Sequence, residues 1–297
     1  TVRMKIDDNS RISLSNNDSG TSNTIFGKTA GDSDGAGDYN SFFGELAGGT
    51  GTQTDAADFN IAIGYNSLTN LTQGTNNTVV GAMAGDASTT TTNMTLIGRG
   101  AGGAINHTDA IGTVAVGSSS LESITSGIGN VAVGYQSLNQ EDDGDFNTAV
   151  GYQALTAQTG TSGTVGSTAV GYQAGLAVTT GIESTFTGYQ SGKAITIGRW
   201  NTAYGTQSLL TDDVGDFSTA IGIYSLYSQN SDSNNETTGN TGLGAYTGFY
   251  NVTGQNNTYL GFNSGKGASG QSNSNNTAVG KDAMAAVTTG SNNVAIG

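Results

Sequence analysis

The sequence predicts an all-β protein, a parallel β-solenoid of about 16 rungs, on three observations. A short box around a glycine recurs along nearly the whole chain, at a regular spacing that has a fixed minimum. Apolar residues keep the same places in each box, which a disordered chain does not show. The 48 glycines are not spaced every third residue and proline is absent, so collagen is excluded.

The box is most complete at residues 147–155, and we call its glycine the anchor. The spacing between neighbouring anchors is 17 in ten of the fifteen intervals and 19 to 22 in the other five. A fixed minimum with occasional additions is typical of stacked coils with variable loops on one edge. The anchors are Gly27, Gly44, Gly64, Gly81, Gly98, Gly117, Gly134, Gly151, Gly171, Gly188, Gly205, Gly222, Gly244, Gly261, Gly280 and Gly297.

Two regions follow from this spacing. Residues 23–297 form the repeat solenoid, and residues 1–22 lie outside the repeat and read as two short strands of an N-terminal cap or junction. At ~4.8 Å per rung, the solenoid is a rod about 70 Å long. The chain lacks an initiator methionine and stops inside a repeat, so we expect it to be a piece of a longer protein.

The residues before each anchor predict a strand that is apolar on both faces. A bulky residue stands directly before the glycine and a small one stands before that, as in Ala149-Val150-Gly151. Because successive side chains of a strand point to opposite faces, we expect the bulky column to fill the interior of the coil. The small column, from Ala62 to Ala278, then needs another chain packed against it, which predicts an oligomer.

Other places in the box predict structural roles. The anchors, which include Gly64, Gly134, Gly151, Gly171, Gly205 and Gly280, are expected to adopt a backbone conformation closed to a Cβ or to admit a neighbouring backbone. Asparagine stands four residues before the anchor in eleven of sixteen copies, which predicts a hydrogen-bonded ladder from rung to rung. Four residues after the anchor, leucine predicts a core contact and glycine a tight turn.

The boxes at residues 130–134, 147–151 and 293–297 resemble the head repeats of YadA-like trimeric autotransporter adhesins. The longer form Gly-Tyr-Gln-Ala/Ser-Leu/Gly, as at 134–138, 151–155 and 171–175, is similar to bacteriophage tail-fibre repeats. The resemblance covers residues 23–297 and implies a left-handed β-roll, a homotrimeric fibre and a role in attachment. Adhesin heads of this type run on a shorter period than this chain does, so the outer half of each coil is expected to differ.

The resemblance and composition together set the expected function. We expect a structural segment of a bacteriophage tail fibre used in host recognition, with a bacterial surface adhesin head and a glycan-degrading tailspike as alternatives. The expected partners are a cell-surface glycan or protein receptor and other virion or adhesin segments. The expected location is the virion tail fibre or the extracellular cell surface.

Several classes of function are disfavoured by the residues themselves. A net charge of −14 repels nucleic acid, and no apolar run reaches the ~20 residues that a membrane span needs. Cysteine is absent and the one histidine, His107, lies in an irregular insert, so no metal-thiol chemistry or catalytic triad can be assembled. We therefore predict no enzymatic activity, no catalytic residues and no obligatory cofactor.

Carboxylates gather in the inserts, where calcium is a candidate ligand. The calcium candidates are Asp142, Asp143, Asp145, Asp212, Asp213 and Asp216. Four copies share an Asp-aromatic pair just before the box: Asp38-Tyr39, Asp58-Phe59, Asp145-Phe146 and Asp216-Phe217. The alternatives are a solvated acidic edge with the aromatic ring over the core, and a glycosidase carboxylate pair.

Tyrosine follows the anchor directly in five copies, at Tyr65, Tyr135, Tyr152, Tyr172 and Tyr189. A structural ladder between rungs is the favoured interpretation of this row. Stacking against sugar rings of a receptor is the alternative.

Overall fold

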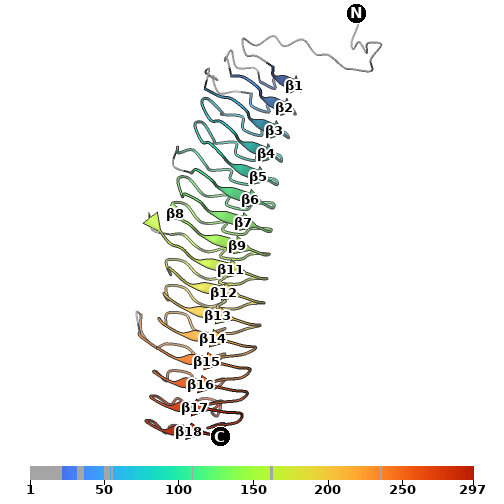
Figure 1. Cartoon of the computed structure of the whole chain (residues 1–297). Helices are drawn as coiled ribbons and strands as arrows, with labels where there is room; N and C mark the ends of the chain where they lie inside the picture. Colours follow the sequence, from blue (N-terminus) through green and yellow to red (C-terminus); the bar gives the residue numbers. More distant parts are fainter. Residues whose placement is uncertain are drawn as a thin grey trace, which may run out of the picture.

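The computed structural model describes residues 22–31, 37–49, 54, 56–108, 110–160, 163–234 and 236–297. The proposed cap, residues 1–22, lies outside this range except for Ser22. The described part is a rod in which one short strand per turn stacks on the next (Figure 1). It contains no α-helix, and so no helix that is long and apolar enough to cross a membrane.

Sixteen strands form one parallel sheet along the rod, which confirms the predicted parallel β-solenoid with about fifteen turns. In order they are β1 (Thr24–Phe26), β2 (Ser41–Phe43), β3 (Ile61–Ile63), β4 (Thr78–Val80), β5 (Thr95–Ile97), β6 (Val114–Val116), β7 (Val131–Val133), β9 (Thr148–Val150), β11 (Thr168–Val170), β12 (Thr185–Thr187), β13 (Thr202–Tyr204), β14 (Thr219–Ile221), β15 (Thr241–Leu243), β16 (Thr258–Leu260), β17 (Thr277–Val279) and β18 (Val294–Ile296). A second parallel pair, β8 (Gly144–Asp145) and β10 (Gly163–Thr164), lies on the edge from which the longer inserts emerge (Figure 1).

Every strand of the large sheet ends directly before an anchor glycine, and equivalent residues pair across turns. Val150 of β9, for example, lies beside Val170 of β11. The anchors have φ between +124° and +159°, a region that side chains rarely adopt. A Cβ on Gly151 would stand 2.3 Å from the carbonyl oxygen of Gly171. Glycine is therefore required both by the backbone angle and by the backbone of the next turn.

The two faces of the strands are the reverse of our expectation. The middle residue of each strand, which we call the inner column, points into the coil, and Ala62, Ala115, Ala132, Ala149, Ala203 and Ala278 are fully buried. The residue directly before the anchor, which we call the outer column, points outward, so the bulky residues Ile63, Val80, Ile97, Val116, Val133, Val150 and Val279 do not fill the interior. The prediction that the alanine column is covered by another chain is wrong, because the chain covers it itself.

The physical reason is that residues from the turns already fill the interior opposite the strand. Leu155, four residues after its anchor, is fully buried even though its φ is +48°. The seventh position after the anchor is a further buried column, occupied by Leu71, Ile105, Ile124, Val178 and Ile195. Little room remains, and alanine on the strand fits it.

The inner column and the fourth position after the anchor are complementary in volume. In most turns where the strand carries alanine, as at Ala203, the turn supplies a leucine, here Leu209. Ala169 with Gly175 is an exception, because the Phe186 ring of the next turn lies over Gly175. Where the strand carries a large side chain, as at Phe186, the turn has glycine, and a Cβ on Gly192 would lie 2.2 Å from the Phe186 ring. The glycine thus makes room for the ring, which corrects its reading as a turn requirement alone.

The asparagine ladder is confirmed. The Nδ2 of Asn77 donates to the Oδ1 of Asn60 at 2.9 Å, and the Nδ2 of Asn60 donates to the Oδ1 of Asn40 at 3.1 Å. The same Oδ1 atoms also accept the backbone N–H of the next turn, both where that turn has asparagine, as from Asn77 to Asn60 at 3.1 Å, and where it does not, as from Met94 to Asn77 at 3.1 Å. Most of these asparagines also close their own turn, as when Asn77 Nδ2 donates to the carbonyl of Thr91 at 2.9 Å, whereas Asn147 Nδ2 donates to Glu141 Oε2 at 3.3 Å. The ladder therefore satisfies buried backbone groups throughout the rod.

Candidate functional site

The most extensive candidate surface is the outer face of the large sheet. Outer-column side chains are apolar in fifteen of the sixteen strands, Thr187 being the exception. Ile63 is 41% exposed, Leu243 43% and Tyr204 58%, so bulky apolar groups face outward along the whole rod. Contiguous exposed apolar surface of this extent is typical of an interaction face.

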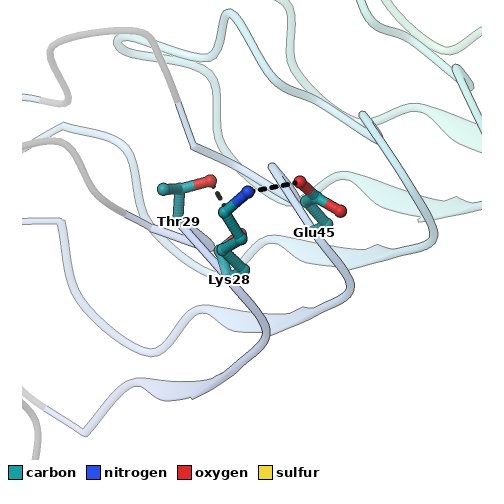
Figure 2. Close-up of polar contacts among 3 residues, drawn as sticks. All are labelled: Lys28, Thr29 and Glu45. Atoms are coloured by element: carbon teal, nitrogen blue, oxygen red, sulfur yellow. Dashed lines mark hydrogen bonds and ion pairs between the residues drawn. The ribbon is translucent and has the colours of Figure 1, made fainter.

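The position directly after the anchor forms the border of this face. At the first two turns it carries an ion pair on the surface, in which Lys28 Nζ lies 3.3 Å from Glu45 Oε1 (Figure 2). Thr29 Oγ1 donates to the Lys28 carbonyl at 2.7 Å, which fixes the local turn (Figure 2). Both charged side chains are largely exposed, so this pair adds little stability.

Four of the five tyrosines in the same column form a stacked ladder. Tyr135, Tyr152, Tyr172 and Tyr189 follow one another with ring centroids 5.2, 5.4 and 5.3 Å apart and planes within 21° of parallel. Because the ring faces contact one another, mainly edges and hydroxyl groups remain for a ligand. The geometry supports the ladder interpretation over sugar stacking for these four, whereas Tyr65 stands outside the stack.

A glutamine ladder, which was not predicted from the sequence, runs beside the tyrosines. The Nε2 of Gln153 donates to the Oε1 of Gln136 at 3.0 Å, and the same bond recurs from Gln173 to Gln153, Gln190 to Gln173 and Gln207 to Gln190 at 2.8 to 3.1 Å. Its signal in the sequence is the glutamine two residues after five successive anchors. The two ladders together stiffen this stretch of the rod.

The structure divides the calcium candidates among separate roles. Asp145 Oδ1 and Asp216 Oδ1 each accept a backbone N–H from the preceding turn, of Ile128 and Arg199, at 2.8 Å. The same bond joins Asp58 to the N–H of Asp38 at 2.7 Å. In three of the four Asp-aromatic pairs, the aspartate therefore holds one turn to the next.

The aromatic members of those pairs do not cover the core. Tyr39, Phe59, Phe146 and Phe217 are each about half exposed, and Tyr39 and Phe59 stack on one another with centroids 5.0 Å apart. All four have φ near +60°. The expectation of a ring over the core is wrong.

Asp212 is buried at the seventh position after its anchor, where some turns carry the apolar residues named above and others carry the polar residues Ser88, Gln158, Gln229 and Asn251. Its Oδ1 accepts the N–H of Gly215 at 3.2 Å and of Ser231 at 3.1 Å, and its Oδ2 accepts Gln229 Nε2 at 2.6 Å. These donors already occupy the carboxylate. Asp213, its neighbour, keeps one buried oxygen without a hydrogen bond.

Asp142 and Asp143 lie with Glu141, and one oxygen of each carboxylate falls within 4.8 Å of the others. Among the described residues this is the one group of three possible metal ligands. Glu141 is fully buried, and its Oε1 accepts the N–H of Gly144 at 2.8 Å and of Asp142 at 3.1 Å. Burial raises the pKa of the Glu141 carboxyl, with further contributions from the charges of Asp142 and Asp143. Calcium stays one alternative for this group, beside the solvated acidic edge.

His107 is exposed in its insert.

The chain matches no family model and no curated protein sequence. The candidate surfaces are an apolar outer face, a border of stacked tyrosines and an acidic insert edge.

Proposed function

We propose that the chain is a segment of a rigid attachment fibre, in which three copies of a left-handed solenoid pack side by side along one axis. The fibre belongs to a bacteriophage tail and takes part in recognition of a receptor on the host cell surface. The observation that carries the proposal is the exposed outer column, whose isoleucine, valine, leucine and phenylalanine side chains leave a long apolar strip uncovered in a single chain.

The size of the strip suits an interface between copies. Sixteen rungs at ~4.8 Å and a strand width of about 10 Å give a strip of roughly 700 Å² per chain. A standard stable interface buries about 800 Å² per partner, so the strip is of the right order. The occupant is a second copy because the strip keeps one repeat from end to end, which an identical rod matches rung by rung.

The number three, the left-handed coil and the role in attachment follow from the resemblance to YadA-like head repeats and tail-fibre repeats. The Gly-Tyr-Gln form of the box, which builds the tyrosine and glutamine ladders, favours the phage fibre over a bacterial adhesin head. A virion-docking domain in the flanking sequence would support the fibre, and a membrane-anchor barrel would support the adhesin. Turnover of capsule or lipopolysaccharide by the purified protein would instead support a tailspike.

The test of assembly is the mass in solution. We expect light scattering to give about three times the 29.8 kDa of one chain. Val133→Asp with Val150→Asp places two carboxylates in the outer column and should release single chains. The control Asn230→Asp adds a carboxylate at an exposed place on the insert edge and should leave the mass unchanged. A folded wild-type protein with the mass of one chain would refute the trimer.

The test of attachment is adsorption of the purified trimer to host cells. A labelled wild-type fibre should bind a susceptible strain, and should fail to bind a mutant strain that resists adsorption of the phage. Equal binding to both strains would contradict the role in recognition.

A further inference from the structure

The turn after β5 has glycine at two positions where neighbouring turns carry side chains. Its second and fifth residues after the anchor are Gly100 and Gly103, whereas the turn below has Met83 and Asp86 there, and the turn above has Glu122 at the fifth place. The missing side chains leave a cavity of about 270 Å³ lined by all five residues. The cavity is a notch in the side of the rod, one turn high.

Three oxygen atoms border the space that side chains fill in other turns. Glu122 Oε1 lies 3.4 Å from the place where a Cβ of Gly100 would stand. Asp86 Oδ1 and the carbonyl oxygen of Gly100 each lie 3.5 Å from the corresponding place at Gly103. The other carboxylate oxygen of Glu122 is held by Asn139 Nδ2 at 3.1 Å, which orients Oε1 toward the notch.

The negative charges of Asp86 and Glu122 also repel one another. Burial raises the pKa of the Asp86 carboxyl, and the charge of Glu122 raises it further, against the backbone N–H groups of Asp86 and Ala87, which lower it. A cation between the carboxylates would relieve this repulsion. Arg99 lines the same cavity and contributes a donor for a neutral or anionic group.

We propose that the notch binds an amino sugar of the cell surface through its free primary ammonium group. Asp86, Glu122 and the Gly100 carbonyl offer three acceptor oxygens to an ammonium, which has three N–H donors, whereas calcium takes six to eight oxygens. The Met83 side chain gives a sugar ring one apolar wall, and the volume suits a single sugar unit. The proposal rests on the attachment function above and names the chemistry of one receptor.

The experiment compares D-glucosamine with N-acetyl-D-glucosamine, which differ in the charge of the amino group, by calorimetry on the purified protein. Two variants address the notch. Gly103→Leu fills it with a side chain that Leu176 and Leu210 carry at the same place in other turns, and the φ of Gly103 and its nearest contacts of 3.5 Å allow the change. Glu122→Gln removes one charge. Asp232→Asn, on an exposed insert, is the matched control.

We expect glucosamine to bind and N-acetylglucosamine not to bind. Gly103→Leu should abolish binding, Glu122→Gln should weaken it about tenfold, as the loss of one charged hydrogen bond does, and the control should leave it unchanged. Far-UV circular dichroism checks that each variant stays folded.

Three results would overturn the proposal: no binding of glucosamine, equal binding of both sugars, or unchanged binding to Gly103→Leu. Displacement of glucosamine by micromolar calcium would overturn it too, because the cavity would then be a metal site. Cell adsorption keeps the two proposals apart. Fibres that adsorb to cells without binding glucosamine leave the attachment function standing and remove the amino sugar.

Discussion

The volume complementarity between the inner column and the fourth position after the anchor can be tested by making the strand side chain smaller and the turn side chain larger. Phe186→Ala removes a fully buried ring and should destabilise the protein by about 3–5 kcal/mol. Gly192→Leu alone places a Cβ 2.2 Å from that ring, and should cost about 1–3 kcal/mol for overpacking and about 1–2 kcal/mol for a leucine at a φ of +57°.

The double variant should be far more stable than the sum of the two changes. It reproduces the combination of Ala203 with Leu209, a leucine that already sits at a φ of +50°. We expect a net cost of about 1–2 kcal/mol and a coupling energy of about 3 kcal/mol or more, at the upper end for residues in contact. The leucine does not fill all of the ring's volume, since the ring also packs over Gly175 of the turn below.

Two measurements suit this cycle. Urea unfolding is followed by the fluorescence of Trp200, the one tryptophan, which lies one turn from Phe186. Solenoids can open locally, so hydrogen exchange of the turns around β12 gives the local free energy beside the global one. If the double variant loses as much stability as the two single changes added together, the proposed complementarity is refuted.

Four further predictions concern the ladders and the carboxylates. Gly151→Ala should cost about 3 kcal/mol or more in urea unfolding, since its Cβ meets the next turn's backbone at a φ of +141°; a loss below about 1 kcal/mol would contradict this. Asn77→Ala should cost about 2 kcal/mol and expose the Met94 amide to faster hydrogen exchange, whereas unchanged exchange there would argue against the ladder. Because the pKa of Glu141 is raised above its ordinary 4.5, its contribution to stability is complete below that pH and is lost as the pH rises through the raised pKa. The melting temperature should therefore climb as the pH falls from 7 toward 5, less so in Glu141→Gln, and an equal climb in both would exclude this carboxyl as a cause. Chelation of calcium should leave the melting temperature unchanged, since the acidic inserts already use carboxylate oxygens for backbone N–H groups; a clear drop would establish a metal site instead.

The sequence predicted the position of every strand in the large sheet, because the anchor glycine marks a backbone contact that no other residue permits. It did not predict which face of the strand is inside. The alternation of side chains along a strand defines two faces but does not say which of them is buried. That depends on how much of the interior is already filled by Leu155 and its equivalents in other turns. The pairing of Phe186 with Gly192 and of Ala203 with Leu209 recurs in most repeats of the sequence, and it indicates that these two positions share one space.

The candidate surfaces were predictable to a smaller extent. The tyrosine ladder was expected, since stacking follows from identical residues one rung apart. The burial of Glu141 and Asp212 was not expected, because a charged residue in an insert is ordinarily exposed, and the seventh position after the anchor is apolar in some turns and polar in others. The notch depends on side chains that are missing from one turn, which only the arrangement of three turns in space makes visible.

The inserts on one edge have a consequence for the dimensions of the fibre. The long turn from Gly222 to Gly244 and the short turn from Gly205 to Gly222 each advance the sheet by one strand, because the additional residues leave the stack sideways. Axial length is therefore counted in anchor glycines, at ~4.8 Å each, and not in residues. Loops on that edge can be exchanged or enlarged to present new chemistry while the reach of the fibre stays constant.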